Sequence, residues 1–500
     1  MKMVKSLLLG SAAGLVAVAG AQAADLPVKA KPVEYVKICS LYGEGFYYIP
    51  GTDTCILFGG YIRAQYGWNT TGGRTPHYTG TGGAQDRTVS SYSTVHRGNM
   101  WIDTRTQTAY GTLRTYQLYQ FAEQDQGATE ARPTRAFIQW AGFTFGHTVS
   151  FTDPPGQTGD GAGGFQSLHA GQNISDSGAN GTNQIAYTWD LGSGASISVG
   201  ADERRVKSLS NLSTNVTSVG VDPTTSRAGM NHPNPWIAFK LIQAWGQFGT
   251  ALILNKNAAT YYNGNNAVTG GIGCPVAPVA GTVQTGTTQC FYPSDEWGWA
   301  VLSGVEIKLP QIAPGDRIGG FFNYGIGATA YSGGSLLNSP GLFGSGNNVA
   351  LGVVTDGVYV NGGSIQQTTS WSAGGGFEHF WTRNFSSVVY GSYTEITYNS
   401  TVVGNRWFCG GGGAAVQSIV VAAATNCDPS FHFWTVGSIT NWYPVPGLRL
   451  AVDVLWTAID TAYNGQVITL SKASGARPTG AYTANNQGIL SVVFRAQRTF

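Results

Sequence analysis

The residues with the clearest chemical potential in this sequence are arginines and aspartates that lie near one another in its first third. The arginines are Arg63, Arg105, Arg114 and Arg135. The aspartates are Asp153, Asp160 and Asp176. Guanidinium groups on one wall opposite carboxylates on another set up an electric field that orders water and selects passing solutes by charge. Taken singly, each arginine would equally fit a rim position or a loop-packing position.

The three aspartates belong to one long stretch, from Ser150 to about Gly181, that contains no Lys or Arg. This stretch is rich in Gly, Ser, Asn and Gln and has no hydrophobic periodicity, which predicts a loop. A loop of this length inside a compact fold is uncommon unless it has a function. We expect it to fold into the interior of a β-barrel and to narrow it. An ordinary surface loop is the alternative.

The first residues have the pattern of a secretory signal peptide. Lys2 and Lys5 precede an apolar stretch from Leu7 to about Ala19, and Ala21-Gln22-Ala23 fits a cleavage site. The apolar stretch is shorter than the roughly 20 residues of a membrane-spanning helix, which argues against an anchor. We expect cleavage after Ala23.

The composition argues against a soluble domain of ordinary type. Charged residues make up 11% of the chain, whereas soluble domains contain about a quarter. Gly (71 residues) and aromatic residues (12%) are abundant, as in strands joined by flexible loops with aromatic side chains at membrane interfaces. Loss of the signal leaves 26 of the 28 basic residues against 26 acidic ones, and this balance argues against nucleic-acid binding.

Segments of alternating polarity recur along the chain and predict strands. In one of them the apolar residues are Ile62, Ala64, Tyr66 and Trp68, and the intervening polar positions include Arg63 and Gln65. A soluble sandwich would bury the apolar face. An outer-membrane barrel would turn it to lipid and turn the polar face to a water-filled interior. No uncharged apolar run of about 18 residues follows the signal, so any membrane crossing would use strands.

The connections between these segments separate the two folds, because short and long ones alternate. The expected long loops cover about 69–94, 122–133, 152–182, 203–234, 256–296, 331–367, 399–430 and 461–486. Tight turns at one end and long loops at the other are typical of outer-membrane barrels. We therefore predict an all-β, transmembrane, antiparallel up-and-down barrel of about sixteen strands. The expected segments are a signal peptide over 1–23, a leader over 24–55 and a barrel over 56–500.

The last segment, Ile489–Phe500, also alternates and ends in Phe, which resembles the C-terminal signature of outer-membrane proteins. Leu490, Val492 and Phe494 share the parity of Phe500. Arg498 has the same parity and fits an interfacial position at the barrel rim, where a charge costs little.

The six cysteines fall into three neighbouring pairs and predict three local disulfides in an oxidising compartment. The pairs are Cys39/Cys55, Cys274/Cys290 and Cys409/Cys427. Metal ligation is the less favoured alternative because the spacings contain no C-x-x-C pair. No metalloprotease or nucleotide-binding motif is present, so we expect neither an enzyme nor a cofactor.

Three blocks of the sequence carry a family resemblance: VKICSLYGEGFYYIPGTDTCILFGGYIRAQ (Val36–Gln65), RGNMWIDTRTQTAYGTLRTY (Arg97–Tyr116) and RAFIQWAGFTFGHTVSF (Arg135–Phe151). They resemble the general porins of rhizobial-type alphaproteobacteria. The sequence departs from the family pattern at His147, Thr152 and Pro154-Pro155.

The resemblance implies a homotrimeric, sixteen-stranded barrel in the bacterial outer membrane, with its third loop folded inward. It also implies passive diffusion of small hydrophilic solutes and ions. The pore constriction would use Arg63, Arg105, Arg114 and Arg135 on the wall and Asp153, Asp160 and Asp176 on the loop. The expected partners are outer-membrane lipid and lipopolysaccharide, the other two subunits and the solutes, and no nucleic acid.

The sequence is also compatible with other functions. A channel selective for a substrate such as an oligosaccharide needs an aromatic track, for which Tyr61 and Tyr116 are the only hints. An outer-membrane enzyme would need a catalytic constellation, and none is recognisable. An adhesion or structural barrel would have an interior filled by side chains.

Overall fold

The computed structural model describes residues 37–125, 127, 129–157, 165, 167–169, 177, 181–213, 226–263, 289–333, 339–409, 425–470 and 473–500. The predicted signal peptide lies outside these residues, so cleavage after Ala23 stays a prediction. The chain divides into two compact units, Met1–Leu57 and Phe58–Phe500.

The described part of the first unit is a small element closed by a disulfide. β1 (Tyr47–Tyr48) pairs with the start of β2 (Cys55–Trp68), and one turn of 3₁₀-helix, η1 (Ser40–Tyr42), precedes it. Phe46 and the Cys39–Cys55 disulfide are buried together and form the core of this element.

The second unit is built on a closed antiparallel barrel of sixteen strands. These strands are β2, β5 (Tyr92–Thr108), β6 (Gly111–Gln124), β7 (Glu130–Trp140), β8 (Phe143–Thr148), β9 (Thr182–Gly192), β10 (Ala195–Asp202), β12 (Asn234–Gln243), β13 (Gly246–Asn257), β16 (Glu296–Lys308), β17 (Arg317–Ile326), β22 (Thr369–Thr382), β23 (Phe385–Thr397), β24 (Phe431–Val445), β25 (Leu448–Asp460) and β28 (Gln487–Thr499). The predicted fold class is confirmed.

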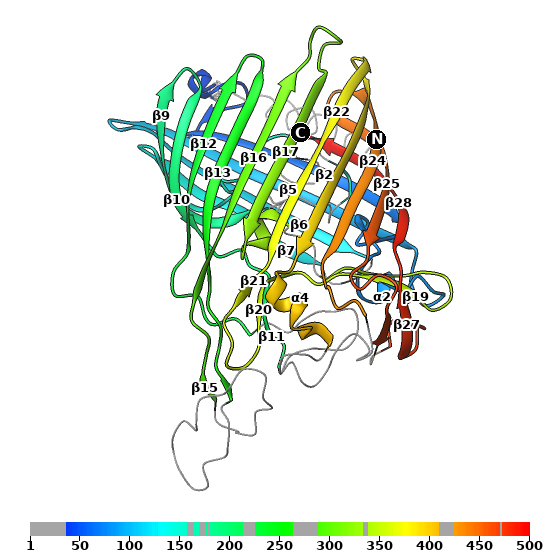
Figure 1. Ribbon diagram of the computed structural model, residues 1–500. Helices are drawn as coiled ribbons and strands as arrows, with labels where there is room; N and C mark the ends of the chain where they lie inside the picture. The colour runs from blue at the N-terminus through cyan, green and yellow to red at the C-terminus, as the bar shows by residue number, and fades with distance from the viewer. Residues whose placement is uncertain are drawn as a thin grey trace, which may run out of the picture. The chain divides into compact units, whose positions relative to one another are not determined.

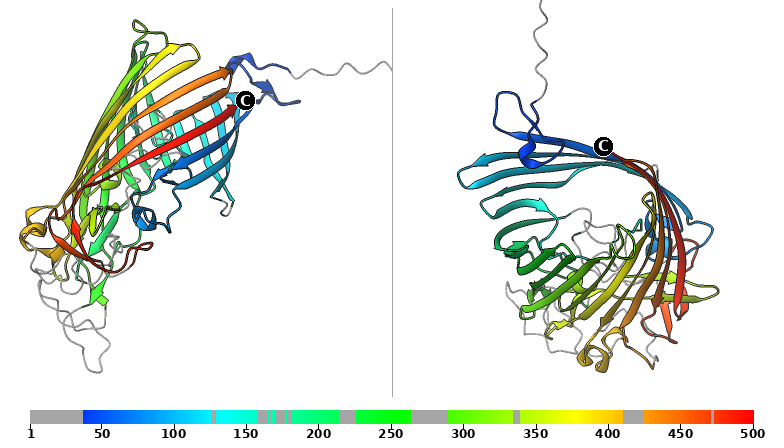
Figure 2. Two further views of the ribbon diagram at one scale, coloured as in Figure 1. Left: turned by 90° about the vertical axis from the view of Figure 1, so that its right-hand side faces the viewer. Right: turned by 90° about the horizontal axis from the view of Figure 1, so that it is seen from above.

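The last strand closes the barrel on the first one. β28 pairs with β2, with Tyr61 opposite Thr499 and Trp68 opposite Val492. The second view of Figure 2 looks along the barrel and shows the strands following one another around its wall. Closure leaves no sheet edge whose backbone groups would be unpaired in lipid.

Short turns and long loops lie at opposite ends of the barrel, as Figure 1 shows. The tightest turns use left-handed backbone: Ala141 and Gly142 have φ of 50° and 87° between β7 and β8. Two successive residues with positive φ match the twist of a two-residue hairpin. One long loop is shorter than expected. β6 and β7 continue their alternation to Gln124 and back from Glu130, so the predicted loop over 122–133 shrinks to five residues.

The outer face of the barrel is apolar, as the alternating pattern predicts. Ile62, Ile185 and Val389 point outward and are 60%, 62% and 59% exposed. Arg498 shares the outward parity of Phe494. It donates a hydrogen bond to the carbonyl of Pro446 in the turn between β24 and β25, as expected at the rim.

The long loops carry short elements that gather at one end of the barrel (Figure 1). They are β3 (Thr70–Thr71), β4 (Thr75–Pro76), α2 (Gly80–Gly83), β11 (Ser208–Asn211), β14 (Tyr262–Asn263), β15 (Gln289–Phe291), α3 (Thr329–Ser332), β18 (Gly341–Phe343), β19 (Asn348–Leu351), β20 (Thr355–Tyr359), β21 (Gln366–Gln367), α4 (Ser400–Gly404), η2 (Trp407–Cys409), β26 (Val467–Leu470) and β27 (Gly480–Ala484).

These loops share a hydrophobic core of their own. Tyr78, Leu342, Phe408, Tyr463 and Tyr482 come from four different long loops and are buried in one cluster. β19 pairs in parallel with β27, and β11 pairs in parallel with β20, so strand pairing also joins separate loops. We call this assembly the loop cap. Within the described residues, no helix is long and apolar enough to cross a membrane.

Candidate functional site

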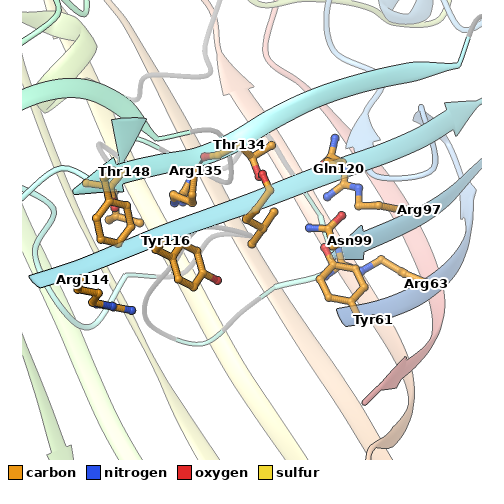
Figure 3. Close-up of a pocket in the computed structure, with 13 residues that line it drawn as sticks. Tyr61, Arg63, Arg97, Asn99, Arg114, Tyr116, Gln120, Thr134, Arg135 and Thr148 are labelled. Carbon is orange, nitrogen blue, oxygen red and sulfur yellow. Dashed lines mark hydrogen bonds between the residues drawn. The ribbon is translucent and has the colours of Figure 1, made fainter. Parts of the chain in front are cut away.

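The inner face of β2, β5, β6 and β7 carries arginines around one cavity of about 410 Å³. The arginines that line it are Arg63, Arg97, Arg114 and Arg135. Figure 3 shows these side chains together with those of Tyr61 and Tyr116. Strand alternation places each of them on the inner face, because successive side chains point to opposite faces of a sheet.

A β-bulge sets the position of Arg135. Leu118 of β6 pairs with Arg135, whereas the next residue, Tyr119, pairs with Pro133, so Thr134 is an extra residue in β7. An extra residue inverts the alternation. As a result Arg132, opposite Gln120, and Arg135 lie on the same face although they are three positions apart.

Arg105 and Arg114 share one carboxylate. Arg105 Nη2 is 2.8 Å and Arg114 Nη2 is 2.9 Å from Asp103 Oδ2, and the Asp103 side chain is only 4% exposed. Arg114 also donates to Gln139 Oε1 at 3.1 Å. Arg105 therefore lies in the predicted cluster, although it does not line the cavity itself. Asp103 neutralises one of the two positive charges.

Arg63 and Arg135 make further contacts at the cavity wall. Arg63 Nε donates to Gln497 Oε1 at 2.9 Å, and its guanidinium lies 4.9 Å from the ring centre of Tyr61. Arg135 donates to the carbonyl of Thr134. These contacts help to hold both side chains at the cavity wall.

Arg97 lines the cavity but was not among the predicted site residues. It lies on β5 with the same parity as Asn99, Asp103 and Arg105, and it is 4% exposed. The signal that could have found it is this shared parity, because every second residue of a barrel strand faces the interior.

The long loop after β8 passes along the inner wall of β16 and β17. Gly156 has φ of 77°, and a Cβ atom there would lie 2.3 Å from the carbonyl of Val305 and 2.7 Å from that of Gly320. Only glycine permits so close an approach at this backbone geometry. Pro155 lies against Gly304, so the unusual Pro154-Pro155 pair belongs to this contact.

Further along, the same loop rests against the inner faces of β23, β24, β25 and β28. Phe165 and Leu168 are buried with Val388, Ile439 and Leu455 of these strands. The loop therefore lies inside the barrel, on the wall away from β5, β6 and β7. Its described residues do not form an ordinary surface loop.

Asp453 of β25 anchors the loop to that wall. Its carboxylate accepts hydrogen bonds from the Leu168 backbone N–H at 2.8 Å, from Ser167 Oγ at 2.9 Å and from the Tyr390 hydroxyl at 2.8 Å. His169 Nδ1 lies 3.0 Å from the same carboxylate, and both side chains are fully buried.

The root of the loop contains a second buried cluster, around Asp153. Asp153 accepts from the Ser177 hydroxyl at 2.7 Å and backbone N–H at 2.9 Å, and Arg205 Nη1 lies 3.5 Å from it. Burial raises the pKa of Asp153, although Arg205 and Ser177 oppose this. Its side chain is 10% exposed and lies at the loop root. Asp160 and Asp176 lie outside the described residues.

Two of the three predicted disulfides are present. They are Cys39–Cys55 and Cys409–Cys427. Cys274 lies outside the described residues, so its pairing with Cys290 stays a prediction. Among the described residues, no group of three or more His, Cys, Asp or Glu side chains could hold a metal ion.

A closed sixteen-stranded antiparallel barrel with an apolar outer face and an arginine-lined interior defines the class of outer-membrane channel barrels. Within this class, a family profile described as "Porin subfamily" matches residues 25–493. The chain therefore belongs to this porin family, and its location is the bacterial outer membrane.

Individual relatives match over shorter segments. Porin Omp2a of Brucella abortus (strain S19) is 35% identical over 202 residues, which is 40% of this chain and 50% of the relative. Porin Omp2a of Brucella ovis is 45% identical over 120 residues, which is 24% of this chain and 32% of the relative. The chain thus spans about half the length, or less, of these relatives.

Among solved structures, the outer-membrane channel DcaP of Acinetobacter baumannii superposes with a TM-score of 0.53 at 13% identity. The superposition covers 91% of this chain and 99% of DcaP. At this identity the likeness supports the fold alone.

Proposed function

We propose that this chain is a diffusion porin, which forms a water-filled channel through the outer membrane for small hydrophilic solutes and ions. The observation that carries the proposal is the arginine-lined cavity on the inner wall of a closed sixteen-stranded barrel. A barrel of this size leaves room for an aqueous path, whereas smaller barrels are filled by their side chains.

The loop after β8 is the constriction of this channel. This role is supported by the burial of Phe165 and Leu168 against the inner wall and by the anchor at Asp453. The loop takes up space on one side of the interior, where Gln65 of β2 also donates to the carbonyl of Leu168 at 3.2 Å, so the path runs between the loop and the wall formed by β5, β6 and β7.

The charge filter consists of Arg63, Arg105, Arg114 and Arg135 on the wall and of loop acids opposite them. Asp160 and Asp176 are the proposed acids. Asp153 was expected to act with them. Its burial beside Arg205 and Ser177 favours a different contribution, in which it holds the root of the loop in place.

The assembly and surroundings of the channel follow from the same proposal. The chain is exported with a cleaved signal peptide over residues 1–23 and functions as a homotrimer. Its partners are outer-membrane lipid, lipopolysaccharide and the solutes that pass through it. The leader over 24–55 precedes the barrel.

Recording of single channels in a planar bilayer tests the proposal. Purified protein should give large, ohmic conductance steps in simple salt. A variant with neutral residues in place of Arg63, Arg105 and Arg135 should have a reversal potential shifted toward cation selectivity. Small steps that an oligosaccharide blocks would instead favour a selective channel in which Tyr61 and Tyr116 form a sugar track. Absence of conductance from folded protein would refute a channel of either kind.

A further inference from the structure

Arg97 is a buried cation without a matching anion in the described part of the chain. Its side chain lies on β5 at the cavity and is 4% exposed. No described carboxylate lies within 4.0 Å of its guanidinium, and its Nε atom has no acceptor among the described residues. A buried guanidinium without a partner is costly because it has lost most of its hydration.

Two neighbours of Arg97 carry buried polar atoms that are also unsatisfied. Asn99 of β5 pairs directly with Gln120 of β6, and both side chains line the same cavity. Asn99 Oδ1 and Gln120 Nε2 have no hydrogen-bond partner within the described residues. Three side chains of the cavity wall thus carry buried polar atoms without a hydrogen-bond partner among the described residues, and Figure 3 shows where these side chains lie.

Unsatisfied buried polar groups are rare in folded proteins, and clusters of them suggest a ligand. A guanidinium binds the oxygens of a carboxylate or a phosphate, and the Gln120 amide can donate to the same oxygens. Asn99 Oδ1 can accept from a hydroxyl group beside the oxyanion. Arg63 and Arg135 line the same cavity and add positive charge.

We propose that Arg97, Asn99 and Gln120 form a binding subsite for a hydroxylated oxyanion, such as a sugar acid or a sugar phosphate. The proposal rests on the channel function above and names the solute class that the channel favours. The subsite binds the anionic group of the solute while the hydroxylated part faces the cavity. Binding must remain weak, because a solute that passes through a channel has to leave the site again.

The test uses the purified full-length protein in a planar bilayer, with gluconate and inorganic phosphate as probes. Each anion is added to a chloride solution, and its half-blocking concentration is measured from the chloride current. Mannitol serves as the neutral probe. For Arg97→Gln we expect block about tenfold weaker for both anions, since a hydrogen bond to a charged group is lost.

Arg132→Gln is the matched control. It removes one positive charge from the inner face of β7, but that charge is already paired with Glu130 at 2.9 Å. Its half-blocking concentrations should stay within about twofold of the wild type. Arg97→Lys should keep the reversal potential of the wild type, because it keeps the charge, and should weaken block less than Arg97→Gln does.

The outcomes separate this proposal from the channel function. If wild-type protein does not conduct, the channel function itself is wrong. If it conducts, and the half-blocking concentrations of both anions are the same for Arg97→Gln as for Arg132→Gln, the proposed subsite is wrong. If Arg97→Gln weakens the block by gluconate alone, or by phosphate alone, the subsite binds that one oxyanion. If Arg97→Gln does not fold, as judged by heat-modifiable gel migration, Arg97→Lys and Gln120→Leu decide. Unchanged anion block in both would overturn the subsite.

Discussion

Single residues give the inner wall two kinds of positive charge. Arg105 and Arg114 share Asp103, so their charges are partly neutralised and their geometry is fixed. Arg97 lies a few residues away on the same strand and has no carboxylate partner among the described residues. Because electrostatic interactions strengthen in a narrow channel with low-dielectric walls, these differences decide how strongly each charge acts on an ion.

Asp103→Asn should increase the effective positive charge of the wall. The substitution removes the negative charge that neutralises part of the positive charge of Arg105 and Arg114. The reversal potential in a salt gradient should therefore shift toward anion selectivity. The shift should be smaller at 1 M salt, where the Debye length is about 3 Å, than at 0.1 M, where it is about 10 Å.

Glu203→Gln is the control for this variant. Glu203 is exposed and directly follows the end of β10, where its carboxylate accepts a hydrogen bond from Asn183 at 2.6 Å, so the substitution removes the same charge away from the interior. An equal shift in both variants would show that overall charge, and not the wall at Asp103, sets the selectivity.

At the level of elements, the inward loop is held by contacts spread along its length. Its root is held around Asp153, its middle packs on β16 and β17 at Gly156, and its far part is anchored at Asp453. Several separate anchors are needed because the described parts of this loop pair with no strand of the barrel. The width of the channel therefore depends on side-chain contacts with the wall.

Asp453→Ala should loosen the far part of the loop. The substitution removes the acceptor for Leu168 and Ser167 and leaves buried donors unsatisfied, at a cost of about 3–5 kcal/mol for a broken buried charged contact. Single-channel records should show more current noise and more frequent changes of level. Asp460→Ala on the same strand is the control, and equally noisy records from it would contradict the anchor.

Deletion of Gly159–Gly178 should raise the single-channel conductance, because it removes Phe165 and the segment anchored at Asp453 from the interior. The variant should be compared with the wild type after heat-modifiable migration has shown that both barrels are folded. A folded deletion variant that conducts no better than the wild type would place the constriction elsewhere.

At the level of the whole barrel unit, the two ends are built differently. One end has tight turns that join neighbouring strands. The other carries the loop cap, whose core includes Phe408 and Tyr463 and whose Cys409–Cys427 disulfide ties one loop together. A disulfide that closes a loop of this size contributes about 3 kcal/mol in the chain-entropy description.

The proposed orientation places the loop cap outside the cell and the tight turns in the periplasm. A single cysteine introduced at Ser345, which is exposed between β18 and β19, should react with a membrane-impermeant reagent on intact cells. A cysteine at Val445, at the end of β24 beside the turn to β25, should not react. Labelling at Val445 alone would invert the orientation.

The barrel and the order of its strands could be predicted from the sequence. Alternation as in Tyr61–Trp68 reports which face of a strand meets lipid, and this property is local because side chains alternate residue by residue. The cysteine spacing likewise predicted the local disulfides at Cys39 and Cys409, since both partners lie in one segment. The inward faces of Arg63, Arg114 and Arg135 followed from the same alternation.

The path of the long loop and the surroundings of each charged side chain depend on the tertiary structure. The anchor joins Leu168 to Asp453, which are 285 residues apart, and no local pattern encodes such a contact. The burial of Asp153 and the lack of a described carboxylate beside Arg97 depend on which strands become neighbours when the barrel closes. Closure is a property of all sixteen strands together, so the charge environment of a single side chain could not be read from the residues around it in the sequence.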